Sequence, residues 1–146
     1  MIAELDYDMM GTRLRQIGEH RIDYALFGSL PVSLGYLMLD YDRVGHRLRQ
    51  VGDHRIEYDV LGTRPSHVGE HEIEYDLVGM RLRRIGDVPV EYDMAGMRVH
   101  RIGPFTVEYD RMGSRPACLV PDGDEQLDEW MCIVAFLVLE AFAPES

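Results

Sequence analysis

The histidines are the residues of this sequence whose spacing most resembles a metal site. His20, His54 and His71 share one position of a repeating unit, and imidazole nitrogens are common zinc ligands. A zinc–nitrogen bond is about 2.1 Å long, whereas positions two strands apart in a β-sheet are separated by about 9.6 Å. We therefore expect exposed histidines at a rim of the fold, and we predict no metal and no cofactor.

The cysteines and acids also offer nucleophiles and bases, but not in a catalytic arrangement. Cys118 and Cys132 are too few for a disulfide framework, so we expect small buried apolar side chains rather than a redox pair. Carboxylates are abundant, but they recur in every repeat, whereas a catalytic pair needs one environment unlike the others. Since no nucleophile with a base and an orienting group can be assigned, we predict that the chain is not an enzyme.

The composition is that of a globular protein with an acidic balance. The 146 residues are 46% hydrophobic and 28% charged, with 26 acids, 15 bases and a net charge of −11. This balance disfavours a nucleic-acid partner, which would require clustered positive charge. No apolar run is long enough for a membrane span, and the N-terminal residues lack a secretory signal pattern. Together with the low cysteine content, these features predict a cytoplasmic protein.

Self-comparison reveals a 17-residue period without insertion or deletion. Seven copies fill residues 3–120, and residues 121–146 form a separate acidic linker and tail that has no base. Each copy holds a tyrosine preceded by an acid, a glycine four residues after the tyrosine and, in six copies, an arginine two residues after that glycine. The tyrosines are Tyr7, Tyr24, Tyr41, Tyr58, Tyr75, Tyr92 and Tyr109.

Each copy is typical of two short strands. IEYD at 73–76 is rich in strand formers, and Asp76 to Gly79 fits a type I turn that ends in a left-handed glycine. MRLRRI at 80–85 then forms the returning strand, and Gly86-Asp87 fits a two-residue type II′ turn. With these turns, Tyr75 lies opposite Arg81 and Ile73 opposite Arg83. Tyrosine and arginine columns then share a face, where cation–π contacts can form between neighbouring strands.

Two arrangements of these strands are possible, a meander of hairpins and a parallel solenoid. A solenoid would stack like charges such as Glu57, Glu74 and Glu91 at about 4.8 Å, whereas a meander sets acid-bearing strands beside arginine-bearing ones. The second copy has Ala25 and Leu30 where the others have aspartate and arginine. Their joint loss indicates an Asp–Arg pair across one turn. We therefore predict an all-β repeat protein, an antiparallel meander of about 14 short strands in seven β-hairpins.

The C-terminal segment must cover the apolar face of this sheet. Residues 125–142 are predicted to form one helix with Asp124 as N-cap and Pro144 after its end. Residues 130–139 are apolar on all sides, which is typical of a helix buried all round. A 14-stranded barrel is too wide for its own side chains to fill, so either the sheet curls into a barrel-like shell around the helix, or the helix packs on one sheet face and on a second subunit.

The second copy is unusually apolar, and we expect it to contact this helix or a partner chain. The interaction residues predicted from the repeat and the helix are Phe27, Leu30, Leu37, Trp130, Ile133, Phe136 and Leu137.

The segment YDLVGMRL at 75–82 resembles the YD repeats of RHS and teneurin-like proteins. Those repeats are β-hairpin units that wrap into hollow shells, and in bacterial members the shell encloses a C-terminal segment. The resemblance, which covers residues 3–120, implies hairpin architecture and an enclosed C-terminal element. The chain departs from it by its strict period, by an extra residue between glycine and arginine, and by its small size, so the enclosure of a toxin is not carried over.

Three classes of function remain for such a chain. The first is a non-enzymatic structural or protein-interaction protein that associates with a partner or with itself. The second is an acidic inhibitor or immunity-type partner of a basic protein, since residues 121–146 carry seven acids. The third is a small-ligand binder or enzyme that uses the interior of the shell. A cavity inside the shell would favour the third class, and a helix that fills the interior would favour the first two.

Overall fold

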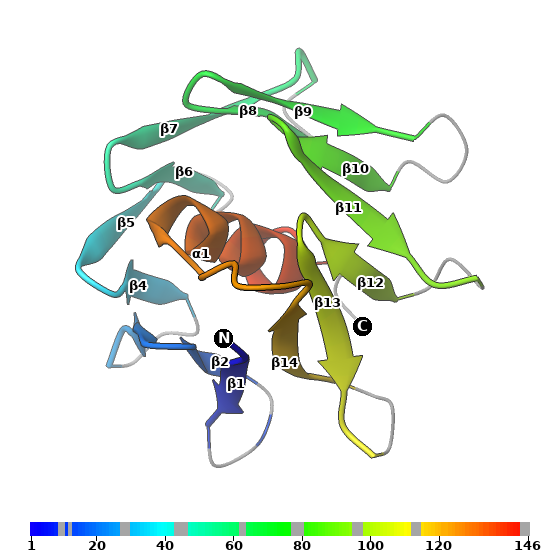
Figure 1. Cartoon of the computed structure of the whole chain (residues 1–146). Helices are drawn as coiled ribbons and strands as arrows, with labels where there is room; N and C mark the ends of the chain where they lie inside the picture. The colour runs from blue at the N-terminus through cyan, green and yellow to red at the C-terminus, as the bar shows by residue number, and fades with distance from the viewer. Residues whose placement is uncertain are drawn as a thin grey trace.

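The computed structural model describes residues 1–8, 11, 13–26, 30–42, 47–61, 64–76, 81–94, 98–111 and 115–143. Fourteen strands form one closed antiparallel barrel, and the chain ends in a helix that runs through the middle of the ring of strands (Figure 1). The strands are β1 (Ala3–Tyr7), β2 (Leu14–Ile17), β3 (His20–Tyr24), β4 (Pro31–Leu34), β5 (Leu37–Tyr41), β6 (Leu48–Val51), β7 (His54–Tyr58), β8 (Pro65–Val68), β9 (His71–Tyr75), β10 (Leu82–Ile85), β11 (Val88–Tyr92), β12 (Val99–Ile102), β13 (Phe105–Tyr109) and β14 (Pro116–Pro121).

The strands follow one another around the barrel in chain order, and β1 closes it by pairing with β14. At this seam Ala3 lies opposite Leu119, and Glu4 lies opposite Cys118. The predicted antiparallel meander with a C-terminal helix is therefore confirmed. Of the two arrangements left open, the structure has the closed shell with the helix inside.

The predicted register of the longer hairpin loop is wrong. Tyr75 lies opposite Leu82, and Ile73 lies opposite Ile85, with a β-bulge between Leu82 and Arg84. The backbone N–H of Asp76 donates to the carbonyl of Arg81 at 2.9 Å, so Asp76 and Arg81 close the hairpin in place of Tyr75 and Arg81. The loop thus closes one residue later than predicted, and the bulge adds one residue to β10. Because each one-residue shift exchanges the two faces of the strand, the two shifts together return the apolar residues of both strands to the interior. The predicted turn residues 77–79 lie outside the described part of the chain.

The predicted shorter turn is confirmed in its length and in the conformation of its glycine. Gly86 and Asp87 connect Ile85 to Val88, which are directly opposite each other. Gly86 has a φ of +60°, the left-handed value that type II′ turns require at this position. A Cβ on Gly86 would lie 2.6 Å from Nδ1 of His71, at the start of the same hairpin, so glycine is needed here for space as well.

The helix inside the barrel begins later than predicted. Helix α1 (Glu129–Phe136) continues as a π-helical turn, η1 (Leu137–Ala141), and its N-cap is Asp128, whose side chain accepts from the N–H of Met131 at 2.8 Å. The predicted N-cap Asp124 lies in a non-helical segment that carries the chain from the wall at β14 to the middle of the barrel. Pro144 lies outside the described residues.

The core is the contact between this helix and the inner face of the wall. Residues Met131 to Val138 are all buried, and the side chains of Ile133, Phe136 and Leu137 have no exposed surface. From the wall, the last residue of the second strand of the first six hairpins contributes a fully buried side chain, as in Ile17, Val51, Val68, Ile85 and Ile102. Within the described residues, the structure holds no helix that is both long and apolar enough to cross a bilayer.

We expect Gly86→Ala to destabilise the protein by about 1–2 kcal/mol. The backbone of residue 86 has a positive φ, which is sterically unfavourable for alanine, and the added Cβ would also clash with His71. Gly123→Ala is the matched control, since its Cβ would meet only the flexible end of Glu125 at 3.4 Å. Urea unfolding of both variants measures the difference. Equal stabilities would contradict the role given to this turn.

Candidate functional site

A ring of tyrosines lines the end of the barrel at which the first strand of each hairpin ends. Each of the seven rings is half-buried against the core, and each hydroxyl donates to a backbone carbonyl of the neighbouring hairpin at 2.6–2.8 Å. The bonds run from Tyr24 to Leu14, Tyr41 to Pro31, Tyr58 to Leu48, Tyr75 to Pro65, Tyr92 to Leu82, Tyr109 to Val99 and Tyr7 to Pro116. The last bond joins the first hairpin to the final strand, so the ring is closed.

Six arginines stack on this ring of tyrosines. In each case the guanidinium carbon lies 4.2–4.5 Å from the centre of the tyrosine ring of the next hairpin. The pairs are Arg13 with Tyr24, Arg47 with Tyr58, Arg64 with Tyr75, Arg81 with Tyr92, Arg98 with Tyr109 and Arg115 with Tyr7. The predicted cation–π contact between neighbouring strands is confirmed, although it arises in a register different from the predicted one. Each contact of this kind is worth about 0.5–1 kcal/mol at an exposed site.

The predicted Asp–Arg pair across the longer turn is also confirmed. Each of the six arginines bonds through Nε to the aspartate that opens its own loop, at 2.7–3.7 Å. In the second copy, where Ala25 and Leu30 replace the pair, the backbone bond between these residues remains at 3.4 Å. The Tyr41 hydroxyl still donates to Pro31 at 2.7 Å. The loop can therefore close without the ion pair, whose role is to hold the arginine over the tyrosine.

The tyrosines are protonated at neutral pH, and their partial burial raises their pKa values further. Burial raises the pKa of Tyr7, Tyr41 and Tyr75 to about 12, and at Tyr75 it outweighs the opposing effect of Arg64. A protonated phenol is a donor, which is what each carbonyl bond of the ring requires. These tyrosines are therefore structural donors, and none is poised as a base.

Glu140 is the one acid that reaches the tyrosine ring from the helix, and sequence reasoning missed it. Its Oε1 lies 3.3 Å from the hydroxyl oxygen of Tyr24, whose proton is donated to Leu14, and burial raises the pKa of Glu140 above the ordinary value. The signal in the sequence was its position as the single charged residue between Trp130 and Phe142.

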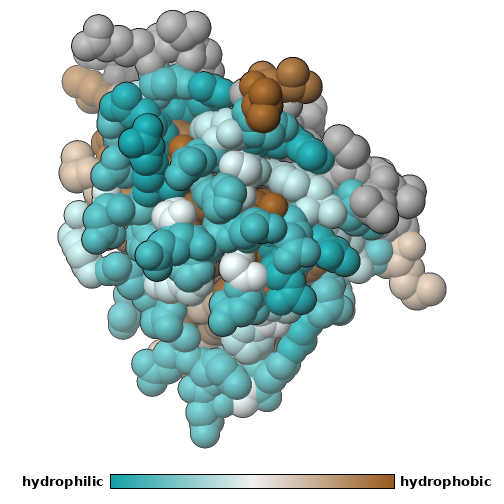
Figure 2. Space-filling model, turned by 90° about the horizontal axis from the view of Figure 1, so that it is seen from above, coloured by the Kyte–Doolittle hydropathy of each residue, from teal (hydrophilic) through white to brown (hydrophobic). Residues whose placement is uncertain are grey.

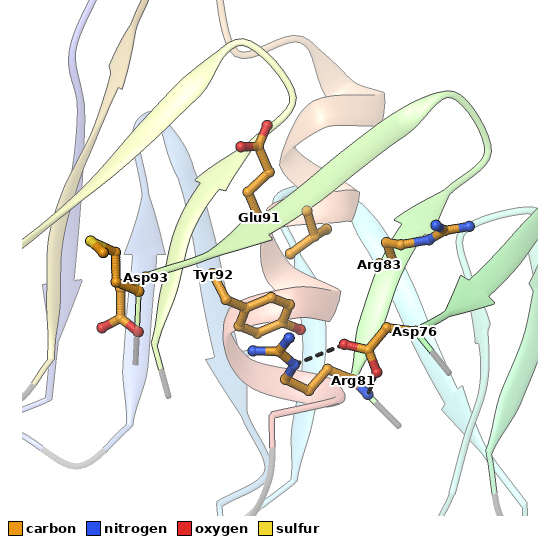
Figure 3. Close-up of a pocket in the computed structure, with 8 residues that line it drawn as sticks. Asp76, Arg81, Arg83, Glu91, Tyr92 and Asp93 are labelled. Atoms are coloured by element: carbon orange, nitrogen blue, oxygen red, sulfur yellow. Dashed lines mark hydrogen bonds and ion pairs between the residues drawn. The ribbon is translucent and has the colours of Figure 1, made fainter. Parts of the chain in front are cut away.

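A shallow hollow of about 520 Å³ lies between β10 and β11, beside one unit of the ring (Figure 3). Asp76, Arg81 and Tyr92 lie together on one side of it, whereas Arg83 and Glu91 point away from them (Figure 3). Arg81 is bonded to Asp76 at 2.9 Å and stacked on Tyr92. Since the same three residue types recur around the barrel, this hollow has no chemistry that the other hairpins lack.

The other end of the barrel holds the histidines, and they are less exposed than predicted. His54 and His71 are half-buried because the helix places Trp130 against them. Their rings lie 5.4 Å and 4.1 Å from the indole ring, and that of His71 is stacked on it. Nε1 of Trp130 is buried and has no hydrogen-bond partner among the described atoms. Within those residues, no three metal-binding side chains are grouped to hold an ion.

The predicted interaction residues separate into two groups. Ile133, Phe136 and Leu137 are fully buried in the core, where they pack with the inner face of the wall. Leu37 and Trp130 are half-buried at the end where the helix begins, and Leu30 is half-buried at the tyrosine end. Phe27 lies outside the described residues. Cys132 is buried in the helix, and Cys118 lies on the outer wall, so both cysteines are free.

Comparisons with protein-family models, with curated proteins and with solved structures found no match to this chain. The function of the chain must therefore be inferred from its geometry. That geometry is a repeated structural unit of aspartate, arginine and tyrosine, whose charged groups bond to one another.

We expect the Asp76 and Arg81 substitutions to be non-additive. Asp76→Ala and Arg81→Leu each remove the same ion pair, so the double variant should cost about 0.5–1 kcal/mol less than the sum of the single variants. Urea unfolding of the four proteins completes the cycle. The second copy, with Ala25 and Leu30, shows that this double replacement is compatible with the hairpin. Strict additivity would contradict the pairing.

We expect Glu140→Gln to stabilise the protein at neutral pH. Burial raises the pKa of Glu140 in the folded state, so the folded state binds the proton more tightly than the unfolded chain. Stability is then lost as the pH rises from the unfolded pKa through the folded one. Glutamine keeps a polar group of the same size beside Tyr24 without the charge. We expect a gain of about 2–4 °C in melting temperature at neutral pH, which corresponds to about 1 kcal/mol for a chain of this length.

The melting temperatures of wild type and Glu140→Gln should converge below the ordinary pKa of a glutamate, where both side chains are neutral. Glu70→Gln, an exposed turn residue, is the control and should leave the melting temperature unchanged. A difference between wild type and Glu140→Gln that does not depend on pH would contradict the assignment.

Proposed function

We propose that this chain is a non-enzymatic structural or interaction protein of the cytoplasm, which works by presenting its outer surface to another protein or to a second copy. The observation that carries this proposal is the filled interior. The helix buries Met131 to Val138 inside the barrel, in the space where a barrel of this size would otherwise hold a ligand. The outer surface is then the part of the molecule available for function.

The paired charges support the same proposal. Catalytic groups need environments that separate their pKa values, whereas the aspartates and arginines of the ring are neutralised by one another in hairpin after hairpin. We further propose that the chain is a small variant of the YD-repeat shells. Its hairpin meander around an enclosed C-terminal helix supports this relation.

A second candidate function, an acidic inhibitor or immunity-type partner of a basic protein, is favoured by one observation. Exposed acids gather at the end of the barrel where the helix begins, from the short turns and from the segment before the helix. They are Glu19, Asp53, Glu70, Asp87, Asp122, Asp124, Glu125, Asp128 and Glu129. A surface of one sign attracts a partner of the other sign at long range, and salt weakens the attraction.

Native mass spectrometry of the full chain, isolated from its source cells, tests the proposal. We expect a mass that corresponds to two or more protein chains, with no retained small molecule. A retained small ligand on a single chain would overturn the proposal in favour of a ligand-binding interior. The second candidate predicts a basic protein in the complex, released by salt and lost in an Asp124→Asn/Glu125→Gln variant.

A further inference from the structure

The second copy carries an apolar strip on the outer wall, which we call the repeat-two strip. It consists of Leu26, Leu30, Val32, Tyr36 and Met38, on β4, on β5 and on the connections beside them. Leu26, Tyr36 and Met38 are 89%, 80% and 66% exposed, and Leu30 and Val32 are half-buried. The strip extends from the longer loop at one end of the barrel to the short turn at the other.

The strip is a departure from the repeat rather than a property of it. The position of Val32 holds Arg15, Arg49 and Arg83 in other copies, and that of Met38 holds Arg21 and Arg55. The position of Tyr36 holds an acid in four other copies, and Leu30 replaces an arginine. Four positions that hold charged residues in other copies are therefore apolar or aromatic together, on β4, on β5 and on the connections beside them. The view from above shows a largely hydrophilic surface with hydrophobic side chains that stand out singly at its edge (Figure 2).

The side chains of the strip lie next to one another on the outer face. Met38 is directly opposite Ser33, and Val32 precedes Ser33 at the β-bulge, so both lie beside the same point of the wall. Tyr36 lies in the turn between β4 and β5, where its hydroxyl contacts the carboxylate of Glu129. The strip therefore lies on two adjacent strands and the connections beside them, in contrast to a scatter of single exposed residues, which would need no explanation.

An ion pair borders the strip on each side. On β3, Arg21 bonds to Asp23 at 3.0 Å, and beyond Met38, Arg49 of β6 bonds to Asp40 of β5 at 2.5 Å. Each border therefore contributes one positive and one negative side chain. A surface with an apolar centre and a balanced border is complementary to a copy of itself, because an arginine of one molecule can face an aspartate of the other.

We propose that the repeat-two strip is a self-association surface, which docks on the same strip of a second copy about a two-fold axis. This inference rests on the proposed function and names the partner and the surface. The closed barrel has no free strand edge, so two copies must associate through side chains rather than by strand pairing. The uncharged centre and the ion-paired borders also allow two chains of net charge −11 to approach, and Glu129 lies beside Tyr36 at one end of the strip.

Other partners fit the strip less well. A basic protein would be attracted to the acid-rich end of the barrel, since Asp23 and Asp40 on the borders of the strip are each paired with an arginine. An anionic membrane would repel a chain of this net charge. A second copy is neither drawn to the acid-rich end of the barrel nor repelled by the uncharged centre of the strip.

Analytical ultracentrifugation of the full chain over a wide concentration range tests the inference. We expect wild type to sediment as a reversible dimer of the 16.8 kDa chain. Val32→Arg/Met38→Arg restores residues that equivalent positions of this barrel already hold, and it should weaken dimerisation by at least about tenfold. Ser66→Arg/Glu72→Gln is the control, because it adds the same charge at the equivalent positions of another copy, and it should dimerise like wild type.

A disulfide test covers the case in which the double variant does not fold. Met38→Cys should form a covalent dimer under air oxidation, because the two strips face each other, whereas Thr106→Cys, at the equivalent position of β13, should not exceed the background from Cys118. The inference is overturned if wild type stays at the single-chain mass, or if the folded double variant dimerises as tightly as wild type. A single-chain mass together with a complex of another protein in native mass spectrometry would remove the self-association surface but leave the proposed function standing.

Discussion

A barrel of fourteen strands encloses more volume than its own inward side chains can fill, and the burial of the C-terminal helix resolves this constraint. From Cys132 to Leu137 the helix has 0–1% of its surface exposed, so it touches the wall on every side. Full burial of one large aliphatic side chain stabilises a fold by about 1.5–3 kcal/mol. The helix also shields the apolar side chains of the inner wall from water. The hairpins and the helix are therefore one cooperative unit, although they are separate in the sequence.

The tyrosine ring is a second constraint, which acts around the wall. Each hairpin is connected to the one before it by strand pairing, by a phenol–carbonyl bond and, in six cases, by an arginine over the tyrosine ring. The bond of Tyr7 to Pro116 and the contact of Arg115 with Tyr7 repeat this arrangement across the seam. The seam is thereby stabilised by the same interactions as any other junction between hairpins.

Much of this architecture could be predicted from the sequence because an unbroken period leaves little choice. Strands, turns and the Asp76–Arg81 pair are local consequences of residue types at fixed spacing. The register of Tyr75 was mispredicted because the longer loop closes at Asp76 and Arg81, one residue later than predicted, and the bulge near Arg83 then shifts the register of Ile73 once more. The helix start was mispredicted because the distance from β14 to the middle of the barrel is a property of the whole fold. The contact of Glu140 with Tyr24 joins residues 116 positions apart, so no local pattern could have predicted it.

Closure of the wall also determines how such a protein can change during evolution. An open array of repeats can gain or lose a unit at either end, since only one neighbour is affected. Here the first and last hairpins contact each other through Ala3 and Leu119, so the wall has no end at which a unit could be added. An added hairpin would widen the lumen beyond what one helix fills, and a lost hairpin would leave too little room for Phe136. Duplication or deletion of a single unit is therefore a change of the whole ring.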